Sequence, residues 1–169
     1  MRRRVVAVIG NSQPPQEAIP VAEELGRLIV DNGWRLVTGG LGGVMEAASR
    51  GARQSQRYQE GDVVGIIPGP EARSANPYVD IVIASNLGYA RNVLVVSSAD
   101  AVVAVGGGAG TLSEMAMAWQ LGRPVLGLAV PGWSARLAGE GLDAKRTDRV
   151  IPAATPLEAV AAIRAAFGG

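Results

Sequence analysis

Residues 101–114 combine a short apolar segment, a run of glycines and the start of a helix pattern. Ala101 to Val105 is unbroken and rich in valine, which is typical of a strand buried on both faces of a parallel sheet. The glycines that follow are Gly106, Gly107, Gly108 and Gly110. Glycine lets the backbone turn sharply and leaves no side chain between the main chain and a ligand. The segment therefore predicts a strand, a glycine turn and a helix amino terminus, whose free N–H groups and positive dipole end favour a phosphate or another anion.

The helix predicted after this turn carries a capping-box spacing, with Thr111 three residues before Glu114. In a capping box the hydroxyl and the carboxylate each bind a backbone N–H group at the start of the helix. Two roles for Glu114 fit the sequence: a cap that only stabilises the helix, or a carboxylate that acts in the cleft.

Two other predicted strands also end in small residues. The strand over residues 4–10 leads into Gly10-Asn11-Ser12, and the strand over 34–38 leads into the glycine-rich run 39–43. Ligands of open parallel sheets bind at the carboxyl edge, where the strand order reverses, so we expect the three turns to form one cleft. The alternative is that the glycines only permit tight packing of helices on strands. The residues expected to bind the ligand are Gly10, Ser12, Gly39, Gly40, Gly42, Gly43, Met45, Glu46, Gly106, Gly107, Gly108, Gly110 and Thr111.

Strand-like and helix-like apolar patterns alternate along the chain. Strands are expected over 4–10, 34–38, 62–67, 78–84, 101–105 and 124–130, with an edge strand at 150–153; helices are expected over 18–32, 44–56, 89–98, 112–121 and 156–167, with a short one starting at Trp133 and a loop over 71–77. This alternation predicts an α/β, Rossmann-like doubly wound parallel sheet, covered by helices on both faces in three layers, in a single domain spanning residues 1–169.

The composition excludes several kinds of chemistry. The chain has no histidine and no cysteine, so any reaction must use carboxylates, arginine, hydroxyls or backbone dipoles, and no metal site or required cofactor is predicted. Lys145 is the only lysine and lies far from the glycine turns, which argues against a pyridoxal-phosphate enzyme. No turn has the P-loop or Gly-x-Gly-x-x-Gly spacing, and the strand over 34–38 ends at Thr38 where NAD binding would need an acidic residue.

Charge and hydropathy limit the partners. A net charge of +1 and few aromatic residues predict no binding to nucleic acid or to an anionic membrane. No apolar run approaches the length of a membrane span, so a cytoplasmic location is expected.

Three blocks of the sequence resemble the LONELY GUY (LOG) family, long mislabelled as lysine decarboxylases. They are Gly39-Gly40 through Met45, Val64 to Pro68, and Gly107-Gly108-Ala109-Gly110-Thr111-Leu112-Ser113-Glu114, which is similar to the family signature Pro-Gly-Gly-x-Gly-Thr-x-x-Glu. The family enzymes release the base from cytokinin nucleoside monophosphates. By this resemblance, Arg91, 23 positions before Glu114, would orient the substrate, Glu114 would assist cleavage, and the signature glycines with Thr111 would hold the phosphate.

The sequence also departs from that family. Gly106 replaces the signature proline, Glu46 stands where a glycine is usual, and only Arg91 remains of the motif before the signature. The chain resembles more closely a branch of nucleotide-binding proteins that includes molybdenum-cofactor carriers. The leading hypothesis is therefore a protein that binds a phosphorylated nucleotide or a molybdopterin-type ligand without transforming it, and the alternative is a phosphoribohydrolase that uses Glu114 and Arg91.

The helix predicted over 112–121 carries apolar residues on more of its circumference than a helix covering one sheet face requires. Related LOG-like proteins form dimers through helices near the signature. Together these observations predict a homo-oligomer, either a dimer or a tetramer.

Overall fold

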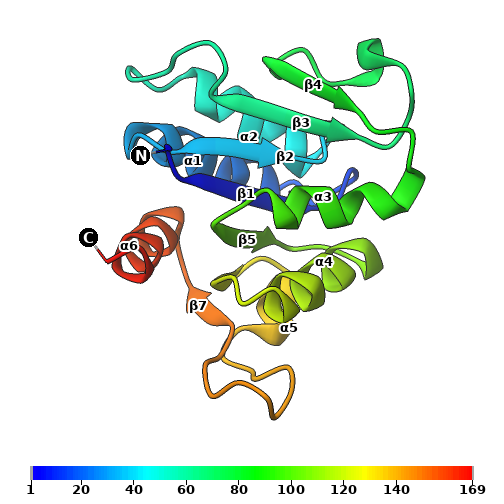
Figure 1. Ribbon diagram of the computed structural model, residues 1–169. Coiled ribbons are helices and arrows are strands. Elements are labelled where there is room, and N and C mark those ends of the chain that lie inside the picture. Colours follow the sequence, from blue (N-terminus) through cyan, green and yellow to red (C-terminus); the bar gives the residue numbers. More distant parts are fainter. Residues whose placement is uncertain (1, 169) are drawn as a thin grey trace.

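The computed structural model describes residues 2–168 as a seven-stranded sheet in which every adjacent pair of strands is parallel (Figure 1). The strands are β1 (Val5–Gly10), β2 (Arg35–Thr38), β3 (Val63–Ile67), β4 (Ile81–Ala84), β5 (Ala101–Val105), β6 (Val125–Leu128) and β7 (Ile151–Ala153). Their order in the sheet is β4-β3-β2-β1-β5-β6-β7, so the direction of winding reverses between β1 and β5. The predicted doubly wound, Rossmann-like architecture is confirmed.

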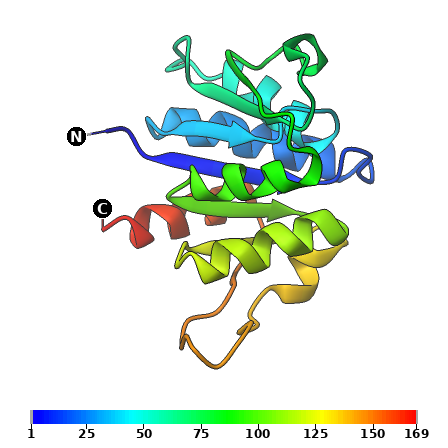
Figure 2. The ribbon, with the colours of Figure 1, turned by 45° about the vertical axis from the view of Figure 1, so that its right-hand side comes forward.

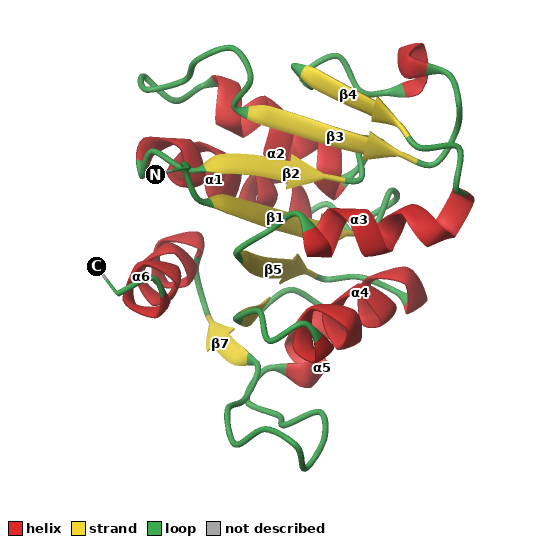
Figure 3. Ribbon diagram, in the orientation of Figure 1, coloured by secondary structure: helices red, strands yellow, loops and turns green. Residues whose placement is uncertain are grey.

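Helices cover both faces of the sheet, which gives three layers (Figures 2 and 3). The helices are α1 (Ala18–Asp31), α2 (Val44–Arg53), α3 (Asn92–Ser97), α4 (Ala109–Gln120), α5 (Trp133–Leu137) and α6 (Pro156–Ala166), with short 3-10 turns η1 (Ala72–Ser74) and η2 (Gly88–Arg91). Helix α1 packs against α2 and α6 in one layer, and α4 packs against α3 and α5 in the other. None of the helices in the described part of the chain has the length and apolar character needed to cross a membrane.

Alternate residues of the central strands enter two separate cores. In β1, Val6 and Val8 pack with α1, α2 and α6, whereas Ala7 and Ile9 face the layer that contains Val95, Met115 and Trp119. Because successive side chains of a strand point to opposite faces, an unbroken apolar strand can serve both cores at once. This explains why β1 and β5 read as continuous apolar runs.

Two elements differ from their predicted bounds for identifiable reasons. Strand β4 begins at Ile81 instead of residue 78, because the N–H of Val79 bonds to the carbonyl of Asn76 in a turn and the Asp80 carboxylate accepts from the amides of Gly61 and Val63. The helix predicted over 89–98 is divided into η2 and a short α3, which is rich in β-branched valine, a residue of modest helix propensity. The other elements begin and end within about three residues of the prediction.

Helices α1 and α2 approach each other through glycines on both helices. A Cβ atom added to Gly26 would lie 1.9 Å from the carbonyl oxygen of Ala48, and one added to Gly51 would lie 1.8 Å from that of Glu23. Backbone therefore contacts backbone at these positions, and only glycine fits. This contact positions α2, whose amino terminus follows the glycine run 39–43.

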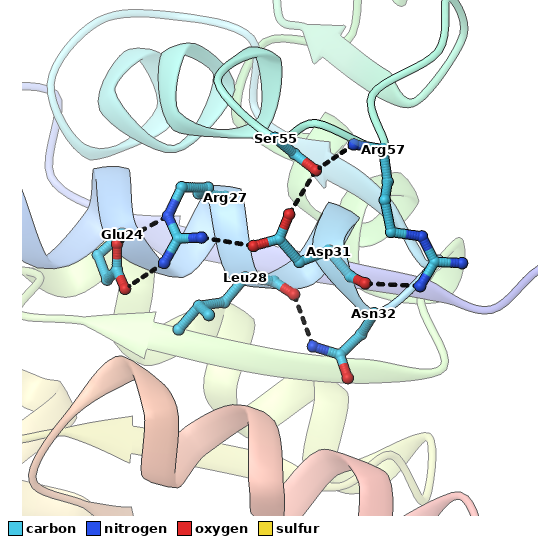
Figure 4. Close-up of polar contacts among 7 residues, drawn as sticks. All are labelled: Glu24, Arg27, Leu28, Asp31, Asn32, Ser55 and Arg57. Carbon is cyan, nitrogen blue, oxygen red and sulfur yellow. Dashed lines mark hydrogen bonds and ion pairs between the residues drawn. The ribbon is translucent and has the colours of Figure 1, made fainter.

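The carboxyl end of α1 is also tied to the chain that follows α2 (Figure 4). Asp31 accepts hydrogen bonds from Arg27 one turn earlier and from the hydroxyl of Ser55 at 2.6 Å. The Asp31 carbonyl accepts from the Arg57 guanidinium at 2.9 Å. Together with the glycine contact, these bonds hold α1 and α2 as one unit beneath the sheet.

We predict that Gly26→Ala and Gly51→Ala each lower the free energy of unfolding by about 1–3 kcal/mol, because the added methyl group forces the helices apart. The intrinsic preference of helices for alanine acts in the opposite direction by about 1 kcal/mol, so a net loss identifies the close contact as its cause. Urea denaturation measures the difference. Gly69→Ala is the control, since a Cβ there meets nothing within 4 Å. Equal stability of all three variants would contradict the prediction.

Candidate functional site

A cleft of about 480 Å³ lies where the strand order reverses, between the carboxyl ends of β1 and β5. Gly10, the last residue of β1, is paired with Val105, the last residue of β5. A Cβ on Gly10 would lie 2.6 Å from the Val105 carbonyl and 2.8 Å from the Val44 side chain of α2. The exits of β1, β2 and β5 therefore converge, as the sequence predicts.

The structure brings nine of the predicted site residues to the wall of this cleft and leaves six outside it. Those at the wall are Gly10, Ser12, Gly39, Met45, Arg91, Gly108, Gly110, Thr111 and Glu114. Those outside it are Gly40, Gly42, Gly43, Glu46, Gly106 and Gly107. Several of the second group shape the turns: Gly43 has φ 66° and would place a Cβ 2.3 Å from the Asn11 carbonyl. Contact between a ligand and the second group stays a prediction.

The glycine turn after β5 is held by side chains of the protein itself. The N–H of Gly106 donates to the Ser134 hydroxyl at 2.8 Å, and the N–H of Gly108 donates to Oδ1 of Asn11 at 2.8 Å. Gly106 and Gly107 have φ of 63° and 101°, which residues with a Cβ rarely adopt. The amides of Gly106 and Gly108 are therefore satisfied by side chains of the protein.

The predicted capping box is wrong. Helix α4 begins at Ala109 with Gly108 as its N-cap and has no side-chain cap, so Thr111 is its third residue and packs its side chain against Gly107. The first intrahelical bond of α4 runs from the N–H of Leu112 to the Gly108 carbonyl. Within residues 2–168, no partner is found for the three N–H groups that precede Leu112, those of residues 109–111. They point out of the positive end of the helix dipole.

The carboxyl group of Glu114 lies in the wall of the cleft, with only 7% of the residue exposed. Burial raises its pKa to about 7, and the charge of Arg91 opposes that rise only in part. A carboxyl group with a pKa near 7 can hold or release a proton at neutral pH. Because α4 has no capping box, the role as a cap does not apply to Glu114.

Arg91 is equally buried and is bound mainly by the protein. One terminal nitrogen donates to the Gly39 carbonyl at 3.2 Å, the other donates to Oδ1 of Asn92, and Nε is buried without a partner. Burial lowers the pKa of the guanidinium, while the charge of Glu114 raises it. Each terminal nitrogen therefore uses one of its two N–H donors within the protein, and Arg91 adds positive charge to the cleft.

Sequence reasoning missed several residues of the cleft. Asn11 and Asn92 contribute carboxamide groups, and Leu41, Pro68 and Tyr89 extend the apolar wall that Met45 begins. Both asparagines lie directly after residues that were identified, Gly10 and Arg91, so their position in the chain was the available signal. Tyr89 is 93% exposed and stands at the mouth of the cleft.

A doubly wound parallel sheet with a cleft and a helix amino terminus at its switch point defines a ligand-binding fold of the Rossmann-like class. Within that class, the chain belongs to the SLOG cluster4 family, which it matches over residues 3–160.

The chain is similar to proteins of bacteria, archaea and algae. An uncharacterized protein of Archaeoglobus fulgidus is 42% identical over 131 residues, which cover 78% of this chain and 83% of that protein. The molybdenum cofactor binding protein of Rippkaea orientalis has 35% identity and a TM-score of 0.87 over 99% of both chains. The molybdenum cofactor carrier protein of Chlamydomonas reinhardtii has 30% identity and a TM-score of 0.83 over 99% of this chain and 100% of its own.

We predict that Glu114 makes stability fall with rising pH. Its pKa is about 7 in the folded chain and 4.5 when exposed, so the folded state binds the extra proton between these values. The contribution is full below pH 4.5 and is lost by about pH 7 to 8, with a span of up to about 3 kcal/mol. Glu114→Gln cannot lose a proton at this position, so its free energy of unfolding lacks this loss. The difference in stability between the variant and the native chain should therefore shift in favour of the variant between pH 4.5 and pH 8.

Urea denaturation of both proteins at pH 4.5, 6 and 8 measures this difference. Glu60→Gln, at an exposed position, is the control and follows the native curve. If the free energies of unfolding of the native chain and of Glu114→Gln change in parallel with pH, Glu114 does not titrate as the structure indicates.

Proposed function

We propose that the protein binds a phosphorylated, nucleotide-type small molecule in this cleft and carries it without transforming it. The observation that supports this most is the meeting of three unpartnered amides of α4 with the buried guanidinium of Arg91 at one cleft. Helix dipole, N–H donors and a nearby cation all favour an anion at the same point. A volume of about 480 Å³ suits a ligand of nucleotide size.

A molybdopterin-type ligand is the form of this proposal that the comparisons favour. The proteins from Rippkaea orientalis and Chlamydomonas reinhardtii are described as binding or carrying the molybdenum cofactor, and each is similar to this chain over 99% of its length. The apolar wall of Leu41, Met45 and Pro68 would hold the ring system of such a cargo, while the end of the cleft at α4 would hold its phosphate. A mononucleotide would use the same two surfaces.

The alternative is a phosphoribohydrolase, and one observation favours it. Glu114 is a buried carboxyl group in the cleft whose pKa is about 7. N-glycosidic cleavage needs a carboxylate to stabilise the positive charge of the sugar and a group that activates water, and a residue with this pKa can do both near neutral pH.

Two measurements decide between carrier and enzyme. Mass spectrometry of the purified protein should reveal a stoichiometric phosphorylated ligand, and incubation with a panel of nucleoside monophosphates should release no free base. Release of base that Glu114→Gln abolishes while binding persists would establish the hydrolase instead. If no phosphorylated ligand binds and no base is released, both functions are rejected.

We further propose that the protein is a homo-oligomer, because one stretch of the chain exposes large apolar side chains and little charge of its own. Between Ile81 and Leu121 the charged residues are Arg91, Asp100 and Glu114, and each is only 7% exposed. This stretch forms β4, η2, α3, β5 and α4, of which α3 and α4 lie side by side on one face of the sheet (Figure 1). Large apolar side chains exposed along it are Ile81, Ile83, Leu87, Tyr89, Val93, Leu94 and Leu121. A second copy of the chain is a suitable partner. In a two-fold dimer the same surface of each subunit faces its equivalent, so a surface without like charges avoids electrostatic repulsion.

We predict that Leu94→Asp converts the oligomer to a monomer, because it places a charge in the middle of the contact. Analytical ultracentrifugation at micromolar concentration measures the change. Leu157→Asp is the control: Leu157 is 67% exposed but lies on α6, in the other helical layer. A native chain that sediments as a monomer would reject the proposal.

A further inference from the structure

Two asparagine side chains flank the amino terminus of α4. Oδ1 of Asn11 accepts the N–H of Gly108, the N-cap, at 2.8 Å. Nδ2 of Asn92 lies 3.9 Å from the point that a Cβ on Gly110 would occupy. Both asparagines line the cleft, although neither belongs to the glycine signature.

The partners of these side chains determine which way each amide group faces. Asn11 meets a backbone N–H and Asn92 meets a terminal nitrogen of Arg91, and both of these groups can only donate. The carbonyl oxygen of each asparagine must therefore face the protein. Each NH2 group is turned the other way, and within residues 2–168 neither finds an acceptor.

Beside the Glu114 carboxyl group, the end of the cleft next to α4 carries several donors. They are the N–H groups of residues 109–111, the two asparagine NH2 groups and Nε of Arg91, which is buried without a partner. Arg91 is 7% exposed and forms no ion pair with residues 2–168, and the Glu114 carboxyl group that acts on its charge is mostly uncharged below its pKa of about 7. A buried, unpaired charge is costly, and an anionic ligand would remove that cost.

We infer that Asn11 and Asn92 bind the ligand directly and select a phosphomonoester or a similar tetrahedral oxyanion. This inference rests on the proposed function and names the chemical class of its ligand. Three terminal oxygens of a phosphate offer enough acceptor sites for this many convergent donors, whereas the two oxygens of a carboxylate leave some of the donors unsatisfied. Arg91, held by Gly39 and Asn92, would supply charge while the neutral amides supply the geometry.

The test replaces only the group that faces the cleft. Asn11→Asp and Asn92→Asp keep the oxygen that faces the protein and exchange the NH2 group for a second, negatively charged oxygen. Isothermal titration at pH 6, where Glu114 is mostly protonated, with AMP and with inorganic phosphate should show affinity lower by about tenfold or more in each variant, because a donor to an anion becomes a repelling acceptor. Asn86→Asp is the control: it adds the same charge at an exposed position outside the cleft lining, at a φ of 53° that aspartate tolerates.

The outcomes separate this inference from the proposed function. If the native protein binds AMP and phosphate and the Asn11 and Asn92 variants bind them equally well, the two asparagines do not contact the ligand and the inference fails while the proposed function stands. If the native protein binds neither probe nor any co-purified phosphorylated ligand, both fail.

Thermal unfolding checks that each variant is folded. Asn11→Ala and Asn92→Ala, which remove the amide group without adding a charge or a hydroxyl donor, serve where an aspartate variant does not fold, and unchanged affinity in them would also overturn the inference.

Discussion

The site depends on how closely the backbone approaches itself where the strand order reverses. Gly10 lies between the carbonyl of Val105 on β5 and the side chain of Val44 on α2, with no room for a Cβ atom. The close contact of α1 with α2 at Gly26 and Gly51 supports the same arrangement from beneath. Protein interiors are densely packed and have low compressibility, so neighbouring side chains do not fill a gap easily. A displacement of α2 would therefore open the cleft at the exits of both β1 and β2.

Hydrogen bonding in this region separates groups that build the site from groups left available to a ligand. Ser134 and Asn11 satisfy two amides of the glycine turn, and so hold its backbone in place. The first turn of α4 keeps its donors free. A site arranged in this way needs little reorganisation when an anion binds, which favours binding because fewer groups must be ordered at that moment.

The two functions proposed for the cleft use the same anion site and differ in the role of one proton. In a carrier, Glu114 would stay protonated beside a bound anion and serve as a neutral donor. In a hydrolase it would have to release and recover its proton during each cycle. A pKa of about 7 is compatible with both roles, and it arises because burial outweighs the attraction of Arg91. The chemistry of the bound molecule therefore decides which role is used.

The amino-acid sequence by itself determined the strand and helix order and the positions of the glycine turns, because these depend on local periodicity and on backbone angles that only glycine adopts readily. The resemblance to the LOG family predicted that Arg91 and Glu114 act in one site, and both line the cleft. Tertiary structure alone decided that Thr111 does not cap α4, that Asn92 and Gly39 accept hydrogen bonds from Arg91, and that Oδ1 of Asn11 accepts the N–H of Gly108. These features depend on contacts between residues far apart in the chain or on the direction of a side chain, and neither has a periodic signal in the sequence.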